Sequence, residues 1–252
     1  MRVFRLLTAR VKPVSGFAYF LHLGLTALLP ALLFVLVRID VAPLGALLIV
    51  LSKWRIFAVK PRHWLANIRV NAVDIMVGIS VLAFMINSGS AGWQLLWALV
   101  YAVWLLVIKP ASGVLIVSLQ ALIAQSLALT ALFLAWGDAP ALVLVAVAWL
   151  VCYLAARHFF FSFEEPLTKL LAYTWGYFAA ALTWVLAHWL LFYGVVSQPT
   201  LFLSVLGFGI GTLYYLEKRD RLSVLVRRQF VFVMVAIIVI VVVLADWGDK
   251  TL

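Results

Sequence analysis

The side chains best able to do chemistry gather in one short stretch, KWRIFAVKPRHWLANIRVNAVD, which covers residues 53 to 74. Five of the nineteen Lys and Arg residues lie in it, although the sequence around it is almost entirely apolar. Arginine and lysine bind phosphate through charge-assisted hydrogen bonds, so this stretch is a candidate site for the anionic headgroup of a lipid. The residues that would bind the headgroup are Lys60, Arg62, His63 and Arg69.

A second set of polar residues lies inside apolar segments, where an unpaired polar group is costly. Asp74 would suit a proton or cation carrier, with His22 at a similar depth as its partner. Alternatively, Asp74 pairs with Arg69 or lies in the first turn of a helix that Asn71 caps, and we favour these structural interpretations. The side chains of a candidate ion or proton path are His22, Asp74, Gln120 and Gln125.

Amides and small residues mark two of the later apolar segments. In residues 113–135, Gln120 and Gln125 project from different sides, and alanines fill another, which indicates a helix surrounded by protein. The simpler alternative to a path is that both amides join helices by hydrogen bonds. In residues 200–216, Gly207 and Gly211 form a G-x-x-x-G spacing that Ser204 extends, a pattern typical of close helix packing.

Several kinds of site are excluded by residue type and depth. The single cysteine, Cys152, rules out an internal disulfide and a multi-cysteine metal site. His22 and His188 are expected near opposite faces of a membrane, so they cannot ligate one metal or haem iron. The motifs EEPLTKL and WVLAH are similar to those of CPBP-type intramembrane proteases, but Glu165 and His188 would lie about 35 Å apart on one helix. We therefore expect a non-enzymatic protein without a metal or cofactor.

The elements that carry these residues follow from the composition. The chain has 252 residues, of which 67% are hydrophobic and 11% charged, whereas soluble proteins average about 45–50% apolar and about 25% charged. Apolar runs long enough for transmembrane helices recur along the sequence, and the alternating segments of a β-barrel do not. The sequence predicts an all-α, polytopic bundle of transmembrane helices.

We predict about nine spans in one membrane domain, residues 17–245, between a basic N-terminal segment, 1–16, and a short tail, 246–252. The second span is the least regular, because it reaches a sufficient length only if it includes Lys53 and Arg55, whose side chains would snorkel to the headgroups. The predicted spans are residues 17–37, 41–59, 71–86, 92–108, 113–135, 139–156, 170–193, 200–216 and 229–245.

The charges of the loops predict the orientation. With nine crossings and a cytoplasmic N-terminus, seventeen of the nineteen Lys and Arg residues face the cytoplasm, and only Arg38 and Lys250 face outside. The C-terminus is then outside. The net charge of +10 therefore reflects basic loops and not nucleic-acid binding. No loop is long enough for a soluble domain, so any chemistry must occur inside the bundle or at its cytoplasmic surface.

Two passages, WRIFAVKPRHWLANIRVNAVD and EEPLTKLLAYTWGYFAAALTWVLAHW, resemble those of polytopic membrane proteins from small-genome bacteria of the Saccharibacteria type. The resemblance covers about a quarter of the chain. It implies a multi-pass protein of the bacterial cytoplasmic membrane, and it implies no activity, cofactor or site residue.

These patterns predict a transporter-like protein or the membrane subunit of a larger complex. The alternative is a lipid-phosphate-binding or lipid-handling protein that uses the basic segment 60–69. The expected partners are the bilayer, anionic lipids at its cytoplasmic face and other membrane subunits, but not nucleic acid. A polar path would require the four candidate path residues to line one cavity, whereas separate packed interfaces would leave a scaffold.

Overall fold

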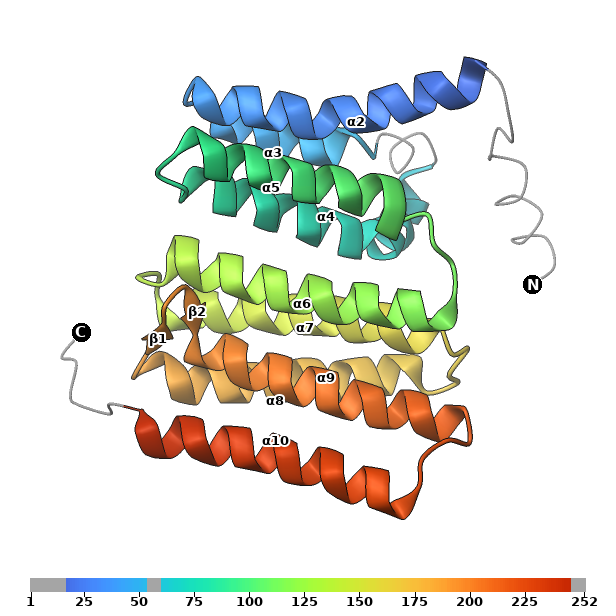
Figure 1. Ribbon diagram of the computed structural model, residues 1–252, viewed down its shortest axis with the longest axis vertical. Coiled ribbons are helices and arrows are strands. Elements are labelled where there is room, and N and C mark those ends of the chain that lie inside the picture. Colours follow the sequence, from blue (N-terminus) through green and yellow to red (C-terminus); the bar gives the residue numbers. More distant parts are fainter. Residues whose placement is uncertain (1–16, 54–59, 246–252) are drawn as a thin grey trace.

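The computed structural model describes residues 17–53 and 60–245, without the side chains of residues 17–23 and 25. Most of the described chain is helical, and the helices lie side by side with similar axis directions (Figure 1). The connections between them gather at the two ends of the bundle. In chain order the elements are α2 (Phe17–Arg38), α3 (Ala42–Leu51), η2 (Pro61–His63), α4 (Trp64–Ile86), α5 (Ala91–Val103), η3 (Trp104–Ile108), α6 (Val114–Trp136), α7 (Ala141–Phe161), α8 (Thr168–Ala187), β1 (Phe192–Tyr193), β2 (Val196–Ser197), α9 (Gln198–Lys218) and α10 (Val224–Leu244).

Among the described residues, seven helical stretches are long and apolar enough to cross a membrane, which confirms the prediction of a multi-pass helical membrane protein. They are η2 with α4, α5 with η3, and each of the helices α6 to α10. They correspond to the third to ninth predicted spans. α2 has 22 residues, and its part with described side chains, Thr26–Arg38, is apolar as well.

The prediction for the second span is wrong in its described part. α3 has only ten residues, so it rises about 15 Å, half of a hydrocarbon core of about 30 Å. It ends at Leu51, and the hydroxyl of Ser52 donates to the carbonyl of Ile49 at 2.6 Å in the turn that follows. Lys53 does not snorkel, because its side chain is only 8% exposed. The predicted continuation falls on residues 54–59, which lie outside the described residues.

The predicted start of the third span at Asn71 is also wrong. α4 begins at Trp64, and the Asn71 amide donates to the carbonyl of Asn67, one turn back, at 2.9 Å. Asn71 is therefore inside the helix and does not cap it. Pro61 starts the preceding turn of 3-10 helix, where a missing backbone N–H costs nothing, and α4 continues directly from it. The polar residues of 60–70 conceal this start, because that part of the helix is largely exposed and shows no apolar face.

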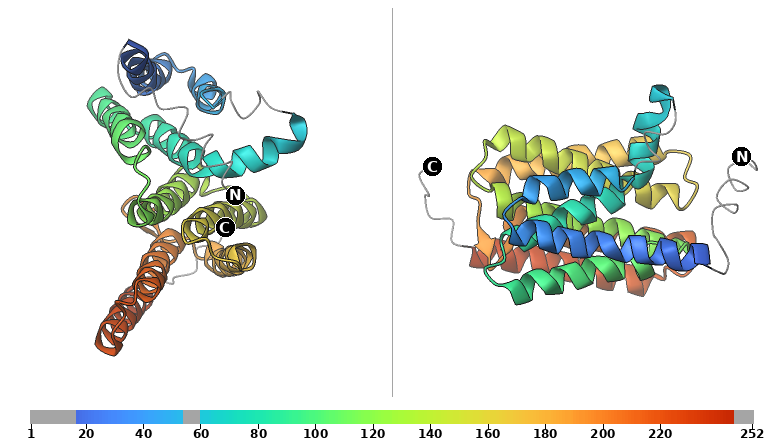
Figure 2. Two further views of the ribbon diagram at one scale, coloured as in Figure 1. Left: turned by 90° about the vertical axis from the view of Figure 1, so that its right-hand side faces the viewer. Right: turned by 90° about the horizontal axis from the view of Figure 1, so that it is seen from above.

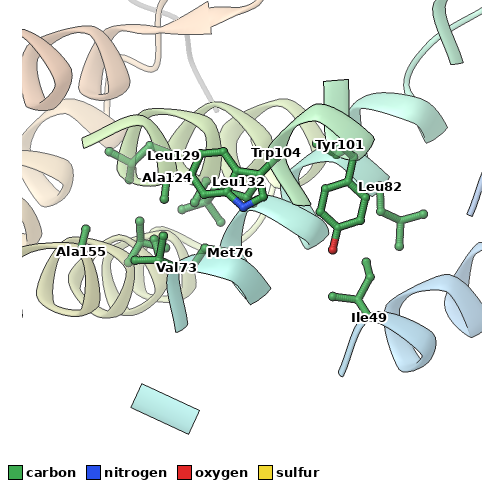
Figure 3. Packing of buried hydrophobic residues seen from close by; sticks show 14 of the residues in the cluster. Ile49, Val73, Met76, Leu82, Tyr101, Trp104, Ala124, Leu129, Leu132 and Ala155 are labelled. Atoms are coloured by element: carbon green, nitrogen blue, oxygen red, sulfur yellow. The ribbon is translucent and has the colours of Figure 1, made fainter. Parts of the chain in front are cut away.

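The core lies where α4, α5, α6 and α7 meet, with α3 adding to one side (Figure 3). α6 contacts α4, α7 and α9, as expected for a helix surrounded by protein. Its buried alanines allow this close approach, since a short side chain brings the backbones together. Those alanines are Ala121, Ala124, Ala128 and Ala131.

α10 lies at the edge of the bundle and packs on α9 (Figures 1 and 2). No residue of α10 is buried, although it is the most apolar of the seven long helices. Its main contact places Met234 over Gly209, where an added Cβ would lie 1.9 Å from the sulfur. Exposure of so apolar a surface fits a helix whose solvent is lipid.

The prediction of an all-helical chain misses one small β-hairpin. α8 ends at Ala187, and β1 and β2 then pair antiparallel, β1 at the end of the predicted seventh span and β2 in the predicted loop that follows it. Their two-residue connection begins with Gly194 at φ +65°, and glycine is the residue that a type II′ turn needs there. A hairpin of four paired residues is too short to produce an alternating pattern.

One end of the bundle, on the right in Figure 1, carries the connections from α5 to α6, from α7 to α8 and from α9 to α10. We call it the basic end, because every described Lys and Arg except Arg38 lies at or near it. At the opposite end, Arg38 is the single Lys or Arg residue among those that the structure describes. This distribution follows the pattern that predicts a cytoplasmic side, and the orientation itself stays a prediction.

Candidate functional site

Asp74 lies in the middle of a charged cluster, which we define as Lys53, Asp74 and Lys109. The ammonium groups of Lys53 and Lys109 lie 3.0 and 2.9 Å from the same oxygen, Oδ2 of Asp74. The other oxygen accepts a long hydrogen bond of 3.4 Å from the indole N–H of Trp104. The Asp74 side chain is 13% exposed, so these contacts stabilise a carboxylate that would otherwise be costly to bury.

The charged cluster ties three elements together, because Lys53 follows α3, Asp74 belongs to α4 and Lys109 follows η3. Asp74 is the eleventh residue of α4, about 15 Å from its start, so the helix-start interpretation is wrong. Asp74 does form ion pairs, but its partners are Lys53 and Lys109, where we expected Arg69. The proposed partner His22 cannot be compared, since its side chain lies outside the described residues.

Gln120 secures the end of η3, a π-helical segment. Its amide donates to the carbonyl of Ile108 at 2.6 Å and to that of Ala111 at 3.3 Å. π-helical turns and helix ends leave carbonyls without intrahelical partners, and here a side chain of α6 supplies the donor. Gln120 therefore binds the connection between α5 and α6 and lies in a different interface from Asp74.

Gln125 joins α6 to two further helices. Its Nε2 donates to the carbonyl of Leu203 in α9 at 3.1 Å, and its Oε1 accepts from the indole of Trp175 in α8 at 2.8 Å. The amide is buried with both ends paired, as expected for an interhelical hydrogen bond in lipid.

The glycines of α9 pack against this amide and its neighbours. A Cβ added to Gly207 would lie 2.9 Å from Nε2 of Gln125, and one added to Gly211 would lie 3.3 Å from Leu122. The hydroxyl of Ser204 donates to that of Ser126 at 2.8 Å. The small face of α9 thus approaches α6 closely, as the spacing predicts.

A cavity of about 500 Å³ lies among α6, α7, α8 and α9. Both glycines of the G-x-x-x-G spacing line it, together with bulky apolar side chains of the other helices. Thr174 and Phe178 of α8 and Ile210 of α9 line it and are also exposed on the outside of the bundle. The cavity therefore reaches the apolar surface between α8 and α9.

Four polar side chains line the cavity, and each has a partner in the protein. Gln125 and Trp175 bond to each other, and the hydroxyl of Thr174 donates to the carbonyl of Leu170 at 3.0 Å. The hydroxyl of Tyr214 donates to the carboxylate of Glu165. The walls consequently present apolar surface to an occupant.

Tyr214 links the cavity to the basic end. The carboxylate of Glu165, in the connection between α7 and α8, also lies 2.8 Å from the ammonium of Lys218. That ammonium stands 5.4 Å from the centre of the Tyr214 ring. The hydrogen bonds from Lys218 and then Tyr214 hold the pKa of Glu165 below its usual range.

The basic segment predicted to bind a headgroup is exposed at the start of α4. Arg62 Nε donates to His63 Nε2 at 2.9 Å, so these two side chains lie together. Lys60 and Arg69 are exposed at the two ends of the segment, and within the described residues neither forms a hydrogen bond with this pair. The four side chains have the charge for an anion, and the structure pairs only two of them.

His188 lies apart from the residues described so far. His188 follows the end of α8, with its Nδ1 2.8 Å from the carbonyl of Trp184, far along the helix from Glu165. Among the residues that the structure describes, no three His, Cys, Asp or Glu side chains are arranged to hold a metal ion.

Sequence reasoning missed the roles of Lys53, Lys109, Glu165 and Tyr214. For Lys53 the available signal was its position directly after an apolar run too short to cross a membrane. Lys109 could have been found as the one cation between two long apolar runs. Their convergence on Asp74 depends on tertiary packing, which spacing does not encode.

Comparison with protein-family models, curated proteins and solved structures finds no match for this chain. Its class therefore follows from its architecture. The described part of the chain is a bundle with seven long apolar helices, which is the architecture of a multi-pass membrane protein. Its function has to be argued from the side chains described above.

Proposed function

We propose that this chain is a non-enzymatic membrane protein that binds a lipid, with a hydrocarbon chain of the lipid in the cavity among α6, α7, α8 and α9. The observation that carries the proposal is the apolar cavity of about 500 Å³ that reaches the outer surface between α8 and α9. Cavities of about 300–1,000 Å³ are the usual size for bound small molecules.

The lining favours a hydrocarbon over a polar ligand. Aromatic rings from three helices, among them Phe159, Trp175 and Phe178, supply most of its bulk. The polar side chains of the lining already have partners within the protein, so only part of their hydrogen-bonding capacity is left for a polar ligand. The hydrocarbon chain of a lipid requires no hydrogen bond.

The surroundings favour an amphiphile whose head lies at the basic end. Tyr214 lines the cavity and contacts Glu165 and Lys218 there. The connection from α9 to α10 and the first turns of α10 add four further cations, and clusters of this kind attract anionic lipids. These cations are Arg219, Arg221, Arg227 and Arg228.

The transporter version of the prediction has less support. Asp74, Gln120 and Gln125 each have their own partners in the protein, and none of the described contacts joins one of them to another. One polar path along these three residues is therefore not the arrangement we propose. The lipid-handling alternative is retained, with its main site moved from the segment 60–69 to the cavity. A location in the bacterial cytoplasmic membrane, with anionic lipids at the basic end, belongs to this proposal.

The experiment blocks the mouth of the cavity. Thr174→Trp adds a large ring at an exposed position of the lining, and Ala181→Trp adds the same ring seven residues further along α8, also exposed but outside the lining. Seven residues are about two helical turns, so both rings lie on the same face of the helix.

Each variant is purified in mild detergent, and the lipids that accompany it are quantified by mass spectrometry. The wild type and Ala181→Trp should retain a stoichiometric lipid, which Thr174→Trp should lose. Equal lipid content in all three proteins would refute the proposal.

A further inference from the structure

The charged cluster of Lys53, Asp74 and Lys109 carries one uncompensated positive charge. Two ammonium groups share one carboxylate, and both contact the same oxygen. On α3, α4, α5 and η3, Asp74 is the only acidic residue in the sequence. A buried charge without a counter-charge is costly, so the cluster favours the arrival of an anion.

The two lysines have hydrogen-bonding capacity to spare. An ammonium group has three N–H donors, and the described contacts use one from each lysine, toward Oδ2 of Asp74. The second carboxylate oxygen is occupied by the indole of Trp104. Several donors therefore remain for an acceptor that approaches the lysines from the side away from Asp74.

An anion can reach the cluster through Lys109. The side chain of Lys109 is 38% exposed at the basic end, while that of Lys53 lies deeper. Arg69 is exposed five residues before Asp74, about 7.5 Å nearer the start of α4, and adds positive charge along the approach.

The other groups near Asp74 are neutral or able to act as donors. His158 of α7 and Tyr101 of α5 lie within electrostatic range of Asp74. Nε2 of His158 and the hydroxyl of Tyr101 are both buried without a hydrogen-bond partner in the described chain. No second carboxylate of α3, α4, α5 or η3 opposes a negative ligand, because the sequence of these elements holds none.

We infer that Lys53 and Lys109 form a binding site for a phosphate group at the basic end, with Asp74 holding the two ammonium groups in place. The phosphate is either a lipid headgroup or a free phosphate, since both present the same oxygens. The site is separate from the cavity among α6 to α9, so it stands whether or not that cavity binds a lipid chain.

The test follows the thermal unfolding midpoint of the full chain in nonionic detergent. One arm titrates inorganic phosphate at constant ionic strength, with chloride as the balance, and the other titrates a short-chain phosphatidic acid. A ligand that binds only the folded state raises the midpoint. A rise in both arms identifies free phosphate as a sufficient ligand, and a rise with phosphatidic acid alone identifies a lipid headgroup.

Variants assign the response to the site. Lys109→Gln should weaken the apparent affinity about tenfold or more, the loss expected for one charge-assisted hydrogen bond. Lys109→Arg should keep the response, as should Lys169→Gln, which removes an exposed cation of the same end on α8. Thr174→Trp should keep it as well, because the cavity is elsewhere.

Two results would overturn the inference. The first is no rise of the midpoint in either arm with the wild type. The second is a rise in Lys109→Gln equal to that of the wild type, which would show that the anion binds at other cations of the basic end.

Discussion

The region around Asp74 and the region around the cavity are held together in different ways. In the first, three charged side chains meet in a cluster that ties α3, α4 and η3 together. In the second, neutral hydrogen bonds through Gln125 join α6, α8 and α9, and the carboxylate of Glu165 lies at the rim. In the first region both carboxylate oxygens of Asp74 have partners, whereas the second region leaves a cavity.

The difference shows how a helix bundle in lipid can combine rigidity with space for a ligand. Ionic contacts fix a junction strongly, because every member depends on the others. Hydrogen bonds from neutral side-chain amides are individually weaker. Small residues such as Gly207 and Gly211 can therefore set the distance between the helices. Where those small residues face the large rings of α7 and α8, the packing leaves the cavity.

The largest expected effect is in the charged cluster. Asp74→Asn leaves two ammonium groups close together without a carboxylate, and removing one partner of a buried ion pair costs about 3–5 kcal/mol. The thermal unfolding midpoint in detergent should therefore fall by more than for any other single variant proposed for these two regions. An unchanged midpoint would mean that the cluster does not hold α3 and η3 to α4.

An intermediate effect is expected for Gln125→Leu. This variant leaves the carbonyl of Leu203 and the indole of Trp175 unpaired, and a buried unsatisfied group costs about 1–3 kcal/mol. Gln120→Leu is the matched control, since its two acceptors lie in or next to the connection after α5. Unfolding measurements should rank Gln125→Leu as the more destabilising, and the reverse order would contradict the central position of Gln125.

The smallest effect is expected for Glu165→Gln, at the rim. Because Lys218 and Tyr214 hold the pKa of Glu165 below its usual range, the ionised carboxylate stabilises the folded state. That contribution is fully present above the pKa of an unfolded glutamate, about 4.3, and is lost as the pH falls through the lower folded value. At pH 7 the thermal unfolding midpoint of the wild type should thus be slightly higher than that of Glu165→Gln. The two midpoints should become equal as the pH is lowered. A constant difference down to pH 3 would contradict this assignment.

The helices were predictable from the sequence because each needs about twenty apolar residues to cross a bilayer. The hydrogen bonds of the Gln120 and Gln125 side chains were predictable too, since a polar group in lipid must find a partner. Both follow from local composition. The class of protein and the crowded position of α6 could therefore be derived without a structure.

The charged cluster and the cavity could not be derived in this way. Lys53 reaches Asp74 only because α3 stops after ten residues and packs beside α4, and the hydropathy of the run favoured a longer helix. The helix start at Trp64 lacks an apolar face, so periodicity did not reveal it. The cavity depends on how side chains of four helices fail to fill one volume, which is a property of packing and not of any one segment.

The central claim is that a lipid chain occupies the cavity, and α10 supplies the comparison that tests it most directly. α10 is apolar and exposed along its whole described length, so lipid should contact it without preference. The measurement is photo-crosslinking of the membrane-embedded protein with a lipid that carries a photoreactive group in its acyl chain, followed by peptide mapping. We predict that the cavity-facing parts of α8 and α9 around Phe178 and Ile210 are labelled well above α10, and that Thr174→Trp removes the excess. Equal labelling of α10 and the cavity, unaffected by Thr174→Trp, would contradict the account.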